Sequence, residues 1–367
     1  MIRQTLNLRP ARLAVAALAL AGALMADGSA QAQNVAGAGS TFVQPLLNRW
    51  SQDYLRSQWT AESQGSAGLD YEAVGSQAGV MRIKDRAVDF GATEVPLSAD
   101  ELKQYGVAQF PVVIGGIVAA VNLPGVEAGK LKLDGALLAD IYLGKLKRWS
   151  DPAIKALNPD LNLPEAEIVA VRRADGSGST FAFTTFLAGV SPAWKPVGAG
   201  LNVKWPAGTA AKGNDGVAET VKKTPNAIGY VDLATARRAG LVAASLKTGA
   251  GGFVAPSPES FQAAAAGADW GAKSDTAPSL INVRGEGAYP IVTTTFVVVP
   301  SAKPSSGRTA AVLDFFNWGF ERGVVQATGL GYVPLPPALV AKVRDHWRDT
   351  LGATPTILPQ PGLFGRS

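Results

Sequence analysis

Apolar, β-rich runs alternate with helical patterns throughout the chain after its first 32 residues. The predicted strands are Val35–Ala38, Val88–Gly91, Val112–Val121, Ile168–Arg172, Ala227–Val231 and Thr294–Val299. The predicted helices are Val43–Ser57, Gly79–Asp85, Gly135–Leu143, Phe181–Ala188, Gly216–Lys223, Arg308–Gln326 and Pro337–Leu351. Strands that alternate with helices predict an α/β protein with largely parallel sheets. Ligands bind in such sheets where loops leave the carboxyl ends of the strands.

Two segments stand apart from this alternation. Three arginines precede an apolar run from Leu13 to Ala26, and Ala30-Gln31-Ala32 follows. This pattern predicts a secretory signal peptide, residues 1–32, with cleavage before Gln33 and a periplasmic mature protein. A retained membrane anchor is the alternative, although the run is shorter than the about 20 residues that a spanning helix needs. The stretch Thr248–Pro258, rich in Gly and Pro, predicts an exposed loop.

Composition narrows the possible functions. About 335 residues remain after the signal peptide, enough for two compact domains. Removing three Arg and one Asp with the signal lowers the formal net charge from +5 to +3, too little to argue for nucleic acid. The chain has no Cys and a single histidine, His346, which excludes thiol catalysis and Cys-ligated metals and argues against His-rich metal sites. We therefore expect no metal and no cofactor.

Four turns of small residues, each after a predicted strand, carry Ser, Thr or an acid. They are Ala38–Phe42, Val74–Gly79, Phe90–Pro96 and Arg172–Phe181. The first N–H groups of a helix lack internal partners and carry partial positive charge, so such a turn can bind an anion. Ordinary helix capping uses the same residues and is the alternative for each turn taken singly.

The fourth turn is more specific because it adds charge. Arg173 can grip two oxygens of a tetrahedral anion, and Asp175 can orient its guanidinium. Ser177, Gly178 and Ser179 then offer further donors. The turn is neither a Walker A loop nor a nucleophile elbow. A surface ion pair on a loop is the alternative for Arg173 and Asp175.

Glu94 is the informative acid of the third turn. A carboxylate beside a bound dianion is repulsive unless the ligand carries a proton that it can donate. Phosphate near neutral pH has such a hydroxyl, whereas sulfate does not, and leaving a site group unpaired discriminates strongly between ligands. A helix-start acid or an exposed loop residue is the alternative.

At these turns the sequence resembles the periplasmic phosphate-binding proteins of ABC-type phosphate importers, over nearly the whole mature chain. The Arg-Ala-Asp-Gly-Ser-Gly block that begins at Arg173 is the most specific motif. Further matching segments are Phe110–Gly116, Leu133–Gly135, Asp140–Lys145, Lys212–Gly216, Ala227–Val231 and Gly267–Trp270.

The resemblance implies a two-lobed periplasmic-binding-protein fold of type II, whose hinge-linked lobes close on dehydrated phosphate. The implied phosphate-binding residues are Ser40, Thr41, Phe42, Ser76, Glu94, Arg173, Asp175, Ser177, Gly178 and Ser179. Thr41 and Phe42 would act through main-chain N–H groups, and Asp175 would be the partner of Arg173. Two residues depart from the family: Glu94 replaces its usual Asp, and Ser179 replaces a frequent Thr.

Family topology also implies a discontinuous first lobe, residues 33–113 plus 288–367, and a second lobe, residues 114–287. The crossings between them would fall near Pro111–Ile114 and Ala288–Ile291. Both crossings have the pattern of extended segments, which suits a hinge.

These residues allow three functions. The first is a binding protein that captures inorganic phosphate and delivers it, as a monomer, to the transmembrane permease of an ABC importer. The second is the same fold with another ligand, such as sulfate, molybdate, a phosphonate or a phosphate ester. The third is an exported phosphatase, which would need a nucleophile with a base or a metal cluster. The sequence shows neither, so we expect no enzymatic activity.

Overall fold

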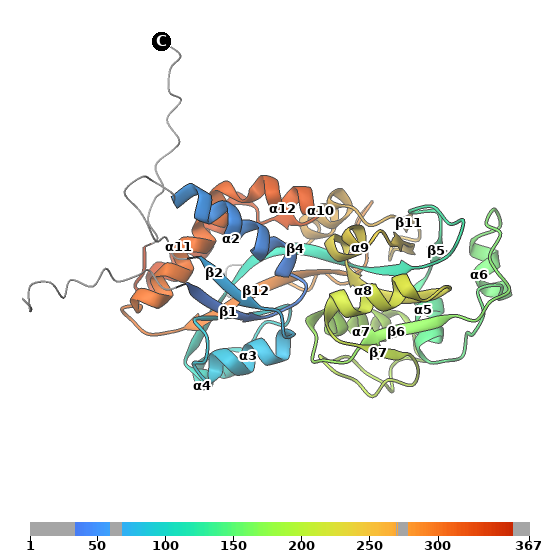
Figure 1. The fold of residues 1–367 in the computed structure, drawn as a ribbon, viewed down its shortest axis with the longest axis horizontal. Coiled ribbons are helices and arrows are strands. Elements are labelled where there is room, and N and C mark those ends of the chain that lie inside the picture. Colours follow the sequence, from blue (N-terminus) through green and yellow to red (C-terminus); the bar gives the residue numbers. More distant parts are fainter. Residues whose placement is uncertain (1–33, 59–67, 269, 271–277, 355–367) are drawn as a thin grey trace, which may run out of the picture.

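The computed structural model describes residues 34–58, 68–268, 270 and 278–354, and it forms two lobes side by side (Figure 1). The predicted signal peptide lies outside the described residues. The long strand β4 (Val107–Val121) extends from one lobe into the other, where it contributes to the sheets of both. A two-lobed α/β fold is what the resemblance implied.

The first lobe is built on the strand order β2-β1-β3-β12-β4. Its strands are β1 (Val35–Gly39), β2 (Leu69–Glu72), β3 (Phe90–Thr93), β12 (Val292–Pro300) and the short β13 (Val333–Pro334), which pairs with β4. Its helices are α2 (Gln44–Gln58), α3 (Ser76–Lys84), α4 (Ala99–Tyr105), α11 (Gly307–Arg322), α12 (Val324–Leu330) and α13 (Pro337–His346), which continues as a π-helix, Trp347–Leu351.

The second lobe continues from β4 in the order β8-β6-β7. Its strands are β6 (Val169–Arg173), β7 (Thr209–Ala211), β8 (Ala227–Asp232) and β9 (Val242–Ala243), with a small separate sheet of β5 (Lys132–Leu133), β10 (Ser245–Lys247) and β11 (Phe253–Val254). Its helices are α5 (Gly135–Tyr142), α6 (Pro152–Leu157), α7 (Gly178–Val190), α8 (Gly213–Lys223) and α9 (Leu233–Ala239). Helix α10 (Pro258–Ala266) packs against β4, β12 and β13.

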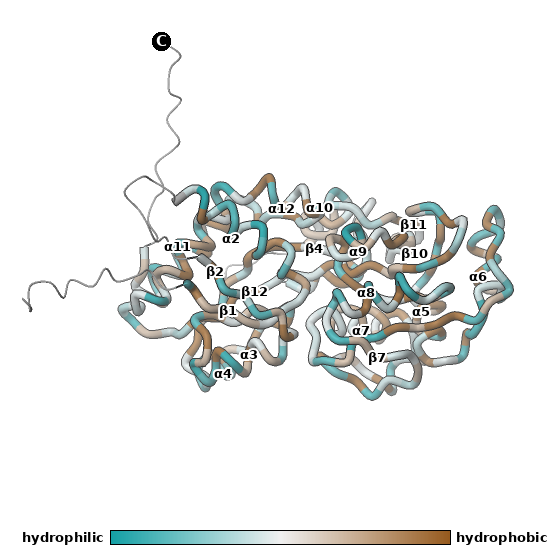
Figure 2. Tube along the Cα trace, in the orientation of Figure 1, coloured by the Kyte–Doolittle hydropathy of each residue, from teal (hydrophilic) through white to brown (hydrophobic). Residues whose placement is uncertain are grey.

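The core follows the strands that link the lobes. Every residue of β4 is buried, and so is every residue of β12 before Pro300. Strands covered on both faces have continuous apolar runs instead of alternating ones. Figure 2 shows hydrophobic residues along β4 and hydrophilic stretches on covering helices such as α2 and α4. Within the described residues, no helix is both long and apolar enough to cross a bilayer.

The sheets are mixed, so the prediction of largely parallel sheets is wrong at the centre of the molecule. Strands β1, β2 and β3 are parallel, and so are β6, β7 and β8. Strand β4 is antiparallel to β8 and β12, and β12 is also antiparallel to β3. The physical reason is that β4 carries the chain from the first lobe to the second, whereas β12 lies in the segment that brings the chain back to the first lobe.

The helix predicted at Arg308–Gln326 is broken at Gly323, between α11 and α12. The indole N–H of Trp50 donates a hydrogen bond of 2.9 Å to the carbonyl of Gly323. A Cβ at this glycine would lie 2.2 Å from the indole nitrogen. Trp50, from α2, therefore occupies the space that a continuous helix with side chains would need.

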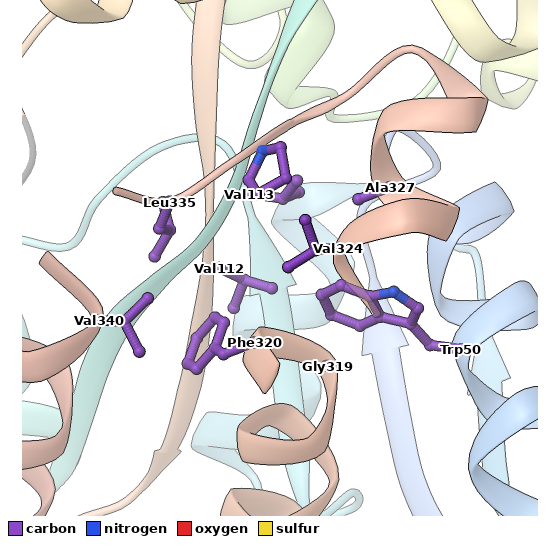
Figure 3. A pocket seen from close by; sticks show the side chains of 10 residues that line it. Trp50, Val112, Val113, Gly319, Phe320, Val324, Ala327, Leu335 and Val340 are labelled. Atoms are coloured by element: carbon purple, nitrogen blue, oxygen red, sulfur yellow. The ribbon is translucent and has the colours of Figure 1, made fainter. Parts of the chain in front are cut away.

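A small cavity lies beside this contact, between α2, β4, α11, α12 and α13 (Figure 3). Trp50, Val112, Phe320 and Val340 line it, and its volume is about 10 Å³. That is about the smallest volume that holds one water molecule, and a water also needs polar partners. The cavity is a gap in an apolar core and not a binding site.

Short elements escaped the sequence pattern. The segment Thr248–Pro258 is not simply an exposed loop, because β10 and β11 form an antiparallel pair and Pro258 begins α10. Three helices, α3, α7 and α8, each begin three residues earlier than predicted. Their first turns contain Gly, Ser, Asn or Gln, and they show no apolar periodicity from which the first residue of the helix could be predicted. As a result, the second and the fourth predicted anion-binding turns include the first turns of α3 and α7.

Candidate functional site

Glu94, directly after β3, lies at the centre of the candidate site and is almost completely buried. Its carboxylate accepts hydrogen bonds from the hydroxyls of Ser40, Ser76 and Thr295, with Ser76 at 2.8 Å and Thr295 at 3.1 Å. A carboxylate can accept about four hydrogen bonds, so capacity for one more remains. Burial raises the pKa of Glu94 above 4.5, against the lowering effect of these hydroxyls and of the Arg173 charge. Glu94 is neither an exposed loop residue nor a helix-start acid, and it can accept a proton from a ligand.

The first turn joins β1 to α2 and is held by its own serine. The Ser40 hydroxyl accepts a 3.0 Å hydrogen bond from the N–H of Phe42 and donates to Glu94. The side chain of Phe42 packs edge-on against Tyr332, whose hydroxyl donates 2.6 Å to the Phe42 carbonyl. Thr41 accepts a 3.2 Å bond from the N–H of Asn214 in the other lobe. The turn is therefore fixed from both sides.

Arg173 ends β6 and is 98% buried. Its Nε donates 2.8 Å to one oxygen of Asp175, and Nη2 pairs with the other. Its Nη1 donates 2.6 Å to the Asn214 side-chain oxygen. Within the described residues these bonds use three of the five guanidinium N–H groups, which leaves one on each terminal nitrogen. A buried, bidentate pair of this kind is not a surface ion pair.

Asp175 supports Arg173 electrostatically. Burial would raise the pKa of Asp175, but the hydrogen bonds and charge of Arg173, with the N–H of Gly213, outweigh it and lower that pKa from 3.8. Asp175 therefore stays ionised at neutral pH and balances the Arg173 charge.

The turn after Asp175 leads into α7. Ser177 is the N-cap of this helix and accepts a 3.2 Å bond from the N–H of Thr180. This capping role was the alternative, but it uses only the oxygen and leaves the hydroxyl hydrogen for a ligand. Gly178 and Ser179 supply the first N–H groups of the helix, where partial positive charge favours an anion.

The two lobes meet at these turns. The N–H of Gly178 donates 3.0 Å to the Ser76 hydroxyl, and the N–H of Gln77 donates 3.1 Å to the carbonyl of Gly176. A Cβ on Gly178 would lie 2.2 Å from a Glu94 oxygen, so only glycine allows this approach. All ten residues named from the sequence lie in or directly beside one connected set of contacts.

Three supporting residues escaped the sequence reasoning. Asn214, at the start of α8, bonds to Arg173 and to Thr41. Thr295, on β12, donates to Glu94, and the Tyr71 hydroxyl donates 2.8 Å to the Ser40 carbonyl. Asn214 could have been found from its segment, Lys212–Gly216, because that segment matches the sequence pattern of the resembled family. Thr295 and Tyr71 lie in ordinary strand patterns that carry no such signal.

The donors of the site are those of an oxyanion-binding site and not those of a metal site or a catalytic site. Within the described part of the chain, no three His, Cys, Asp or Glu side chains gather to hold a metal ion. His346 ends α13, where its ring contacts the Thr350 hydroxyl at 3.2 Å. The site offers hydroxyl, N–H and guanidinium donors around one buried carboxylate.

Comparison with known proteins places this fold in a known class. The family model of the PBP superfamily domain matches residues 26–320. This match covers more than half of the chain and places it in the PBP superfamily, in line with its two-lobed α/β fold. A phosphate-binding protein from Stenotrophomonas maltophilia has a similar fold, with a TM-score of 0.62, 20% identity, and coverage of 85% of this chain and 94% of that one.

Curated relatives narrow the class. The phosphate-binding protein PstS of Xylella fastidiosa is 45% identical over 314 residues, which are 85% of this chain and 84% of that protein. PstS of Pasteurella multocida is 44% identical over 319 residues, 87% of this chain and 91% of the relative. The chain belongs to the PstS family of phosphate-binding proteins, which are transport proteins and not enzymes.

Proposed function

We propose that this protein binds inorganic phosphate between its lobes and delivers it to the transmembrane permease of an ABC importer. The observation that carries the proposal is the buried Glu94 carboxylate, which accepts hydrogen bonds from three hydroxyls of the first lobe and lies against Gly178 of the second lobe. Relatives named phosphate-binding protein PstS support the choice of ligand.

The chemistry favours an oxyanion that carries a proton. Arg173 offers two remaining N–H groups in a planar fork, which matches two oxygens of a tetrahedral anion. The first turn of α7 adds the Ser177 hydroxyl from the second lobe, and the Ser179 hydroxyl, which lies 3.4 Å from the Asn214 oxygen in this structure, would turn to the anion. In the first lobe the Thr41 hydroxyl can donate, whereas the N–H of Phe42 and the hydroxyl of Ser76, which donate to Ser40 and Glu94 in this structure, would exchange those partners for the anion. Glu94 then accepts the one proton that distinguishes hydrogen phosphate from sulfate.

Phosphate would act as the bridge that stabilises the closed arrangement of the lobes. The lobes we propose are residues 33–113 plus 288–367, and residues 114–287. In support of a crossing near this boundary, β4 pairs with β12 up to Gly116 and with β8 from Ile117 onward. Extended segments that change partners in this way suit a hinge.

Export is part of the proposal. The residues before Gln33 have the composition of a signal peptide, and cleavage there would release the protein into the periplasm. There it would act as a monomer and dock on the permease subunits in its closed, phosphate-loaded form. No nucleic acid partner is proposed.

Calorimetric titration tests the ligand. Phosphate, titrated into protein stripped of carried-over phosphate, should bind with a micromolar or tighter dissociation constant, about −8 kcal/mol or better. Sulfate should give no response. A flat phosphate titration would overturn the proposal, and equal binding of both anions would refute the role given to Glu94.

A cavity beside the site favours a second ligand class, the phosphonates or phosphate esters. It has a volume of about 410 Å³ and is bordered by Glu94, Phe181, Thr185, Thr294 and Phe296. Among the described residues, the buried hydroxyls of Thr185 and Thr294 have no hydrogen-bond partner. A small organic substituent with a polar group could occupy this space. Competition of methylphosphonate and glycerol 3-phosphate with phosphate distinguishes the two classes.

A further inference from the structure

Asn214 is a buried residue that contacts both lobes of the proposed phosphate site, one through its side chain and the other through its main chain. It occupies the second position of α8 and is 1% exposed. Its side-chain oxygen accepts a hydrogen bond of 2.6 Å from Arg173 and one of 3.4 Å from the Ser179 hydroxyl. Its side-chain nitrogen donates 2.7 Å to Asp232. Every polar atom of this amide therefore faces a partner of the matching kind.

Asp232 fixes which way the amide points. Its carboxylate caps α9 by accepting 2.8 Å from the N–H of Thr235, and its second oxygen accepts from Asn214. Burial raises the pKa of Asp232 above its ordinary value, but a guanidinium can only donate whatever the charge of Asp232. The amide nitrogen must therefore face Asp232, and the amide oxygen must face Arg173. Only this one orientation satisfies both neighbours.

This orientation decides which guanidinium donors remain for a ligand. Asp175 holds Nε and Nη2 of Arg173, and Asn214 holds one N–H of Nη1. The guanidinium is thus fixed at all three nitrogens. The two remaining N–H groups, one on each terminal nitrogen, are therefore held in fixed directions.

The main chain of the same residue acts on the other lobe. The N–H of Asn214 donates 3.2 Å to the Thr41 hydroxyl oxygen. Because that oxygen already accepts, the hydroxyl hydrogen is left to donate to an anion. One residue therefore orients a donor in each lobe when the lobes are closed.

We propose that Asn214 is a positioning residue for phosphate, which holds Arg173 through its amide and Thr41 through its main-chain N–H. This inference rests on the proposed function of the site. It assigns no direct contact between Asn214 and the ligand. Its effect on phosphate affinity is exerted through Arg173 and Thr41.

The first test is Asn214→Ala, measured by phosphate calorimetry and by the Tm of the phosphate-free protein. We expect the dissociation constant to rise about 10- to 100-fold, as for the loss of a hydrogen bond to a charged group. The matched control is Asn158→Ala, since Asn158 is also buried and its amide bonds to Lys132 and Ile154. That variant should lower the Tm and leave the dissociation constant unchanged.

A second test separates positioning from stability. Asn214→Asp sets two carboxylates against each other and should lower both the Tm and the affinity. Adding Asp232→Asn restores a donor and acceptor pair and keeps the oxygen that caps α9. We expect the Tm to recover, whereas the dissociation constant stays at least about 10-fold above that of the unmodified protein, because a second carboxylate on Arg173 repels the anion.

A double-mutant cycle with Arg173→Lys completes the design. If Asn214 acts through the guanidinium, Asn214→Ala should cost far less affinity when it is combined with Arg173→Lys than when it is made alone. Unchanged affinity in Asn214→Ala, or recovery of affinity together with Tm in the exchanged pair, would overturn the positioning role alone. Absence of phosphate binding by the unmodified protein would overturn the proposed function and this inference together.

Discussion

The N–H of Gly178, in the second lobe, donates a 3.0 Å hydrogen bond to the hydroxyl of Ser76, in the first. The same hydroxyl donates 2.8 Å to Glu94. The approach is so close that a Cβ on Gly178 would lie 2.2 Å from a Glu94 oxygen and 2.7 Å from the Ser76 oxygen. The closed arrangement therefore depends on a residue without a side chain at this position.

We expect Gly178→Ala to weaken phosphate binding by about 100-fold or more, because the added methyl group prevents the lobes from meeting. The phosphate-free protein should keep its Tm within about 2 °C, since an open form has room for the methyl group. The control is Gly189→Ala in the same helix, where a Cβ would meet nothing within 4 Å. Equal affinity of the two variants would contradict this account.

Glu94 is expected to set the choice between phosphate and sulfate. Glu94→Gln removes an acceptor of the phosphate proton and supplies an N–H that sulfate can use. The phosphate dissociation constant should rise about 10-fold or more, and sulfate binding should become measurable. Glu94→Asp keeps the acceptor and should keep sulfate excluded. Titration of both anions into each variant measures the ratio, and an unchanged ratio in Glu94→Gln would argue against the assignment.

The stability of the phosphate-free protein should also report on Glu94. Burial raises the pKa of this carboxyl above 4.5 in the folded protein, so the folded state holds its proton more tightly than the unfolded state does. The resulting stabilisation is complete below the unfolded pKa and is lost as the pH rises through the folded pKa.

Glu94→Gln should therefore be more stable than the unmodified protein at about pH 7, with a difference that shrinks toward about pH 4. Each unit of pKa shift corresponds to about 1.4 kcal/mol in the free energy of unfolding. Urea unfolding at several pH values measures it. A constant difference across this range would show that the titration of Glu94 does not contribute.

Arg173→Lys should weaken phosphate binding about 100-fold, because a lysine ammonium cannot hold Asp175, Asn214 and two anion oxygens in one plane. Arg172→Lys is the matched control, since the neighbouring Arg172 bonds to the carbonyls of Gly208 and Arg173 and not to Asp175 or Asn214. That control should change affinity less than about threefold. Similar losses in both variants would point to a general effect of positive charge.

Gly323 and Gly329 offer a test of the break between α11 and α12. Gly323→Ala places a methyl group 2.2 Å from the Trp50 indole nitrogen and should destabilise the protein by about 2 kcal/mol. Gly329→Ala, in α12 with nothing within 4 Å of its Cβ, should stabilise it by about 0.5–1 kcal/mol. Chemical denaturation gives both values, and the same sign for both would refute the packing argument.

Short-range pattern was enough to locate most of the secondary structure. The apolar run at Val112–Val121 predicted most of β4. The predicted strand Ile168–Arg172 is shifted by one residue from β6, and Ala227–Val231 ends one residue before β8 does. Burial on both faces makes such runs continuous, which is why they are legible in the sequence. Pattern failed where it is weak, as in the two-residue strands β5 and β11.

The sequence by itself determined the chemistry on offer: turns of Gly, Ser and Thr, one Arg with its Asp, and one unusual Glu. It did not determine which of these groups face one another. Only the tertiary structure brought Gly178 against Ser76 and set Asn214 between Arg173 and Thr41. The physical reason is that residues far apart in the chain meet through lobe closure and strand crossing, which leave no periodic trace in the sequence. Local propensity acts within a few residues, whereas a binding site is made by contacts that the whole fold must close.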